Sequence, residues 1–170
     1  MCIRDRTDAL TLEALEDSVS RVTTRLTKKF AEVGLRTATA NVLTVRTLGI
    51  RNGEDQLRTG RVDGVDRQAL VGMLEQNLVP VISPLGYCAD GTSLALDPDM
   101  VAAEIGIVLQ ASKVIFLTGF AIWPVMSGRT KQFSILEVRE FLKNPPETVT
   151  PFITSKYGRG IRTVSYTHLR

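Results

Sequence analysis

Few side chains in this sequence are suited to acid–base or nucleophilic chemistry. His168 is the only histidine among the 170 residues, and Cys88 is one of only two cysteines. A lone histidine invites a catalytic interpretation, because imidazole exchanges protons near neutral pH. The first question is therefore whether His168 belongs to any active site.

The two ends of the chain are related through their coding DNA. When residues 1–5 are back-translated with one choice of codons, the reverse complement encodes residues 164–168 in a single reading frame. One inverted DNA element therefore accounts for both ends, and it resembles the transposon end used to fragment DNA for sequencing libraries. Segments of this origin are excluded from reasoning about the fold.

We assign residues 1–6 and 164–170 to this element and residues 7–163 to the biological segment. The excluded ends contain three arginines and one aspartate, so they carry a net +2 of the formal charge of +3. The remaining segment is close to neutral, which argues against nucleic acid or a membrane surface as a partner. We expect a cytoplasmic protein, and no apolar run approaches the ~18 residues that span a bilayer.

Without His168, the biological segment has no histidine and a single cysteine, Cys88. A catalytic triad of serine, histidine and aspartate is therefore excluded for this segment, as are a disulfide framework and a zinc cluster. Cys88 has no neighbouring base in the sequence to lower its pKa, so we expect an inert thiol. We predict neither catalytic residues nor a metal site here.

Apolar spacing and turn residues predict alternating helices and strands. Steps of three and four residues are typical of a helix, and continuous apolar runs are typical of strands covered on both faces. The expected helices are 10–33, 66–77, one that begins at Asp97-Pro98, and 134–143. The expected strands are 41–46, 79–83 and 114–118, with a glycine-rich loop after the first, a tight turn at Asp90-Gly91 and a hairpin turn at 127–129.

This alternation predicts an α/β domain with a mainly parallel sheet. Ligands of such sheets bind at the carboxyl ends of the strands. The loops at 84–92 and 118–123 follow two of the expected buried strands, so we expect any ligand contacts there.

Three consecutive stretches carry a family resemblance. They are NVLTVRTLGIRNGEDQLRTGRVDGVDRQAL, VPVISPLGYCADGTSLAL and DPDMVAAEIGIVLQASKVIFLT. Together they resemble the N-acetylglutamate synthases, the amino-acid N-acetyltransferases that begin arginine biosynthesis. The resemblance covers about residues 40–118 and continues more weakly to about 163. Agreement across several elements in order is more specific than any one short motif.

The resemblance implies an incomplete amino-acid-kinase-like (carbamate-kinase-like) domain at 7–163, a three-layer αβα sandwich. In that family this domain binds the effector L-arginine and builds a homo-oligomer. A separate domain transfers the acetyl group from acetyl-CoA to L-glutamate. The segment itself is then expected to be non-catalytic and to hold no cofactor.

Two alternatives stay open, a stand-alone ligand-binding domain of the same fold and a true amino-acid kinase such as acetylglutamate kinase. The kinases carry an Asn-x-Asn-x-Asp segment and an acidic turn after a buried strand. Asp99 matches the aspartate, but Ala95 replaces the first asparagine and Gly119 stands at the acidic turn. Both losses disfavour phosphoryl transfer, which needs groups that organise the phosphates.

Asp99 and Lys156 are the two candidate ligand or effector contacts. Lys156 aligns with a late lysine of the family, where it would meet a carboxylate or phosphate. Its alternative is an ordinary solvated lysine in a basic tail. For Asp99 the alternative is a structural acid at a helix start, where the helix dipole stabilises it.

Overall fold

The computed structural model of the chain describes residues 6–115 and residue 117. The helices of this part are α1 (Ala9–Glu32), α2 (Arg67–Glu75) and α3 (Pro98–Val108). The strands are β1 (Arg36–Thr39), β2 (Leu43–Thr47), β3 (Ile50–Arg51), β4 (Glu54–Asp55), β5 (Gly60–Val65), β6 (Leu78–Val81), β7 (Leu85–Tyr87) and β8 (Ser93–Ala95).

α1 is a long amphipathic helix that begins after Asp8. The Asp8 carboxylate accepts the Thr11 N–H at 2.7 Å, which satisfies one of the free N–H groups at the helix start. Leu12 is buried in one cluster with Leu85 and Ala95, and these contacts hold the first turns of the helix on the β7–β8 hairpin. The helix predicted at 10–33 is confirmed.

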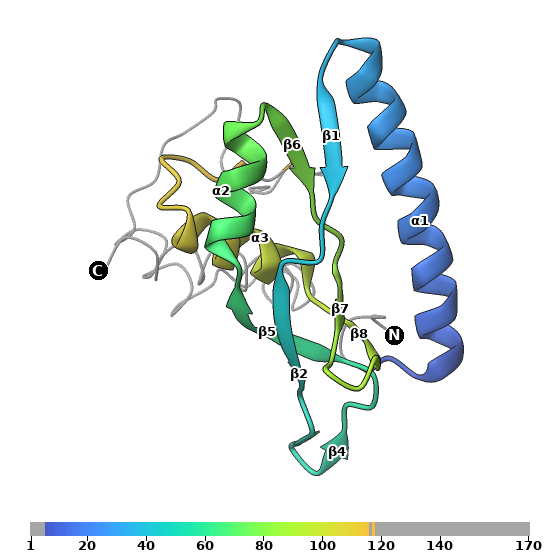
Figure 1. Ribbon diagram of the computed structural model, residues 1–170. Helices are drawn as coiled ribbons and strands as arrows, with labels where there is room; N and C mark the ends of the chain where they lie inside the picture. The colour runs from blue at the N-terminus through green and yellow to red at the C-terminus, as the bar shows by residue number, and fades with distance from the viewer. Residues whose placement is uncertain (1–5, 116, 118–170) are drawn as a thin grey trace, which may run out of the picture.

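β1 and β6 form a parallel pair between two helices. Thr37 pairs with Val79 and Thr39 with Val81. α1 contacts β1 and α2 contacts β6, so the strands lie between the helices, in the helix–sheet–helix order of an αβα sandwich (Figure 1). The other pairs among the described strands, β2–β5, β3–β4 and β7–β8, are antiparallel.

The strand predicted at 41–46 is confirmed as β2, with its ends shifted by one or two residues. Sequence reasoning missed β1, which ends at Thr39 before β2 begins at Leu43. β1 has the sequence Arg-Thr-Ala-Thr, which contains neither an apolar run nor an alternation of large apolar residues. Its strand conformation depends on pairing with β6, which local sequence patterns do not report.

The stretch 49–60, expected as a glycine-rich loop, instead contains a short antiparallel hairpin of β3 and β4 and ends where β5 begins. β3 and β4 are joined by Asn52 and Gly53, with φ of 51° and 80°. Positive φ at both central residues is the requirement of the tight hairpin turn that Asn-Gly favours. β5 pairs with β2 around a bulge at Thr44 and Val45. Sequence reasoning missed β5 because Gly60 and Gly64 interrupt its apolar pattern.

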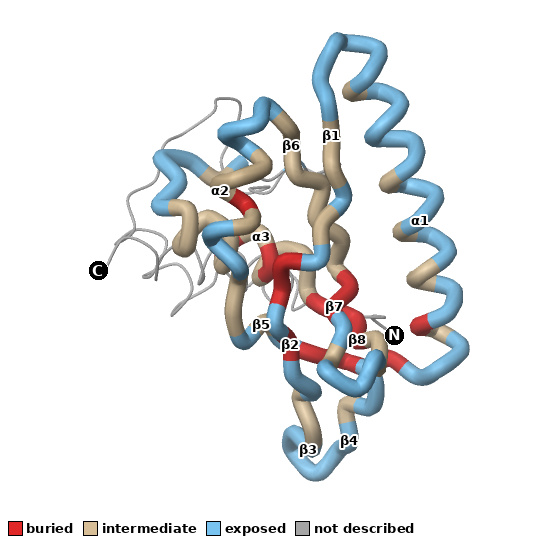
Figure 2. Tube along the Cα trace, viewed as in Figure 1, coloured by how far each residue is buried: buried red, intermediate tan, exposed pale blue. Residues whose placement is uncertain are grey.

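The main core lies where the β2–β5 ribbon meets α2, α3 and β8. Its most buried members are Leu94 and Leu70, which are 0% and 1% exposed. Buried residues gather at this junction and along the β7–β8 hairpin, whereas much of α1 is exposed (Figure 2). The Val45 side chain packs directly against the backbone of Gly86, since a Cβ on Gly86 would lie 2.4 Å from Val45 Cγ1.

The elements predicted over 66–109 are confirmed with small shifts in their ends, but β6, predicted as a strand covered on both faces, is only half-buried. The Asp66 carboxylate caps α2 by accepting the Ala69 N–H at 2.9 Å. Asp97 caps α3, and Pro98 takes the first helical position. The turn at Asp90-Gly91 closes the β7–β8 hairpin, where the Thr92 N–H donates to Asp90 Oδ1 at 2.9 Å.

The fully buried strand predicted at 114–118 is not seen in its described residues. Val114 and Ile115 have no regular secondary structure, and Ile115 and Leu117 are 78% and 94% exposed. A strand forms only beside another strand, and no described strand pairs with this segment. The hairpin turn at 127–129 and the helix at 134–143 lie outside the described residues.

Candidate functional site

A groove of about 660 Å³ lies between α1 and the carboxyl ends of β1 and β6. This is the end of a parallel sheet where ligands bind in α/β proteins. The lining residues come from the middle of α1 and from the segments that follow the two strands. They are Glu16, Val19, Ser20, Thr23, Thr24, Thr39, Ala40, Asn41, Leu43, Val81, Ser83, Leu85 and Tyr87.

The parallel pairing of β1 and β6 positions the strand side of this groove. Thr39 and Val81 are paired at the ends of their strands, so the segments that follow them leave the sheet side by side. Leu85 and Tyr87 belong to the loop region 84–92 where we expected ligand contacts, and both line the groove. The other expected loop, 118–123, lies outside the described residues.

Hydroxyl groups dominate the polar chemistry of the groove. One of them is already engaged, because the Thr24 hydroxyl donates to the Ser20 carbonyl oxygen at 3.0 Å. Glu16 is the one carboxylate among the described lining residues, and none of these is lysine or arginine. Phosphates are held by cations and backbone N–H groups. The described lining therefore suits a neutral or cationic ligand better than a phosphate.

Apart from Leu85 and Tyr87, sequence reasoning missed the residues that form this groove. Glu16 lies in α1, Thr39 ends β1 and Ser83 follows β6, so the three are far apart in the sequence and belong to no shared motif. Finding them would have required recognising β1 and its parallel partner. The polar residues of α1 give a partial signal, since Ser20 and Thr23 lie beside its apolar positions.

Asp99 lies in the first turn of α3, and its N–H donates to Asp97 Oδ1 at 2.9 Å. An acid in this position interacts favourably with the helix dipole. Asp99 is not among the residues that line the groove. Lys156 lies outside the described residues, so a shared role of Asp99 and Lys156 in ligand binding stays a prediction.

Ala95 occupies an apolar position at the end of β8. It is 7% exposed and clusters with Leu12 and Leu85, while its N–H donates to the Arg58 carbonyl oxygen at 2.8 Å. The methyl group here offers no hydrogen bond to a substrate. This agrees with the inference from the sequence that Ala95 disfavours kinase chemistry.

Cys88 is half-buried in the β7–β8 turn and packs against the main core. Its N–H donates to the Thr92 carbonyl oxygen at 2.9 Å. Across residues 6–115 and 117, no group of three or more histidine, cysteine, aspartate or glutamate side chains is arranged to hold a metal ion. No helix in this part is long and apolar enough to cross a membrane.

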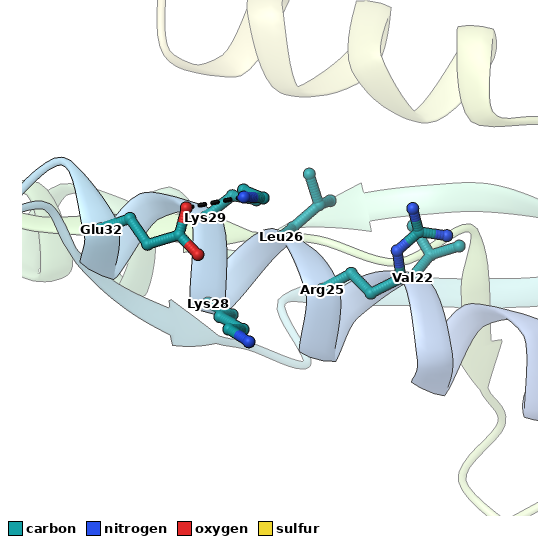
Figure 3. A pocket seen from close by; sticks show the side chains of 6 residues that line it. All are labelled: Val22, Arg25, Leu26, Lys28, Lys29 and Glu32. Carbon is teal, nitrogen blue, oxygen red and sulfur yellow. Dashed lines mark hydrogen bonds and ion pairs between the residues drawn. The ribbon is translucent and has the colours of Figure 1, made fainter.

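A second concave surface lies along the C-terminal half of α1. Val22, Arg25, Leu26, Lys28, Lys29 and Glu32 line it (Figure 3). Val22 and Leu26 are 53% and 42% exposed, and Lys29 Nζ lies 2.7 Å from Glu32 Oε2. Val22 and Leu26 with their charged neighbours define the apolar flank of α1.

The chain belongs to the amino acid kinase family, whose pattern it matches over residues 2–122. The amino-acid acetyltransferase of Pseudomonas fluorescens Pf-5 is 34% identical over 118 residues, which are 64% of this chain and 27% of that protein. The corresponding enzyme of Pseudomonas aeruginosa PAO1 shows the same identity and coverage. The chain thus spans about a quarter of the length of these curated relatives.

Solved structures confirm the fold. N-acetylglutamate synthase from Neisseria gonorrhoeae, complexed with coenzyme A and N-acetyl-glutamate, matches with a TM-score of 0.82 and 22% identity, over 95% of this chain and 36% of that chain. The same enzyme complexed with coenzyme A and L-arginine matches with a TM-score of 0.74, over 95% and 38%. The α/β, amino-acid-kinase-like fold class and the resemblance to N-acetylglutamate synthases are therefore confirmed.

Proposed function

We propose that this chain is part of an N-acetylglutamate synthase, which transfers the acetyl group of acetyl-CoA to the amino group of L-glutamate. The observation that carries the proposal is the 34% identity to amino-acid acetyltransferases over 118 residues. In the proposed enzyme, segment 7–163 is a partial amino-acid-kinase-like domain and the acetyltransferase domain lies in sequence outside this chain. The parent enzyme is cytoplasmic.

The chemistry of the described residues supports a non-catalytic role for this part. A phosphorylating member of the family needs polar groups that organise a nucleotide and its acceptor. The buried methyl group of Ala95 and a groove lining without lysine or arginine both disfavour phosphate binding. An acetyltransferase whose reaction takes place in another domain needs no phosphate-binding groups in this part of the chain.

The deciding experiment uses the longest open reading frame that contains this sequence. The purified protein is assayed for release of coenzyme A from acetyl-CoA, with and without L-glutamate. We expect glutamate-dependent release and no ATP-dependent phosphorylation of N-acetylglutamate in a coupled assay for ADP. Clear ADP turnover would favour the kinase alternative, and an open reading frame without a second domain would favour a stand-alone ligand-binding domain.

We further propose that this part of the enzyme binds L-arginine as an effector and contributes to a homo-oligomer. The complex of the Neisseria enzyme with L-arginine supports the first proposal by likeness of fold. Asp99 and Lys156 are the proposed contacts. Calorimetry should show arginine binding to the parent protein, and light scattering should show a mass above that of one chain.

Matched variants locate the effector. Asp99→Asn and Lys156→Ala should weaken arginine binding if these residues contact it. Glu16→Gln tests the groove, because Glu16 is the one carboxylate in its described lining, and Glu13→Gln is the control on the same helix. If only Glu16→Gln weakens arginine binding, the effector binds in the groove. That result would contradict the roles proposed for Asp99 and Lys156.

A further inference from the structure

We draw no further inference here: the strongest candidate, the apolar flank of α1 around Val22 and Leu26, carries nothing because nothing in the described structure shows what covers it.

Discussion

The β2–β5 and β7–β8 ribbons leave no space for an added methyl group where they meet, whereas β1 and β6 contain no buried residue. Val45 and Gly86 face each other across the ribbon contact. The parallel pair is half-exposed or exposed throughout its length, although parallel sheets are normally covered on both faces. The described chain therefore has one region with a close-packed core and one in which packing is sparse.

The contrast follows from how each region is connected. Antiparallel ribbons can be closed by short turns, such as the two-residue turn between β3 and β4, and one face on a core is enough to hold them. β1 and β6 are joined through the whole stretch from β2 to α2. Among the described elements, α1 packs against β1 and α2 packs against β6.

The largest expected effect comes from Leu94→Ala. Leu94 is fully buried in the main core, so its truncation should lower the free energy of unfolding by about 2–5 kcal/mol. Val79→Ala in β6 is the comparison and should cost clearly less, since Val79 is only half-buried. Urea denaturation measures both, and equal losses would show that β6 is covered as fully as the core.

Gly86→Ala tests the close contact itself. The new methyl group would lie 2.4 Å from Val45 Cγ1, and overpacking of this kind should cost about 1–3 kcal/mol of the free energy of unfolding. Combining it with Val45→Ala should recover part of the cost, because the second change makes room for the first. Gly72→Ala in α2 is the control, because nothing lies within 4 Å of its added Cβ and alanine favours helix by about 1 kcal/mol. A loss from Gly72→Ala matching that of Gly86→Ala would contradict this explanation.

Asp66 marks the joint between the two regions, since it caps α2 and its N–H donates to the Val42 carbonyl oxygen at 2.8 Å. Asp66→Ala should cost about 1 kcal/mol of the free energy of unfolding through loss of the cap. Asp63→Ala removes an exposed ion pair with Arg46 and should cost about 0–1 kcal/mol. Thermal or urea unfolding should show the larger loss for Asp66→Ala. A larger loss for Asp63→Ala would contradict this prediction.

The smallest expected effect is a loss of folding stability at low pH. Hydrogen bonds from the N–H and the side chain of Thr11 lower the pKa of the Asp8 carboxyl from its ordinary value of 3.8. The resulting stabilisation is present above that value and is lost as the pH falls through the lowered pKa of the folded state. Asp8→Asn keeps a good helix cap but does not titrate. Wild type should therefore lose its advantage over this variant below about pH 4, and parallel stability profiles across that range would refute the assignment.

Sequence reasoning located the elements whose signals are local. Asp66 and Asp97 identified the starts of α2 and α3, and the spacing of apolar residues identified α1. β1 was missed because its threonines adopt a strand only through β6. Most of the groove lining was missed for the same reason, since Glu16, Thr39 and Ser83 meet only after that pairing forms. The family resemblance supplied the fold class, which the comparisons confirm, but Asp99 and Lys156 stay predictions.

The tip of the β3–β4 hairpin offers a practical use. Asn52 and Gly53 are exposed, and neither of them lines the groove or belongs to the core clusters. Exposed turns are the sites that best accept inserted sequence, and lengthening a loop costs only about 0.6 kcal/mol for each doubling. A fluorescent reporter or affinity tag inserted between these two residues would allow the protein to be detected in a mixture. The insertion would leave the core unchanged.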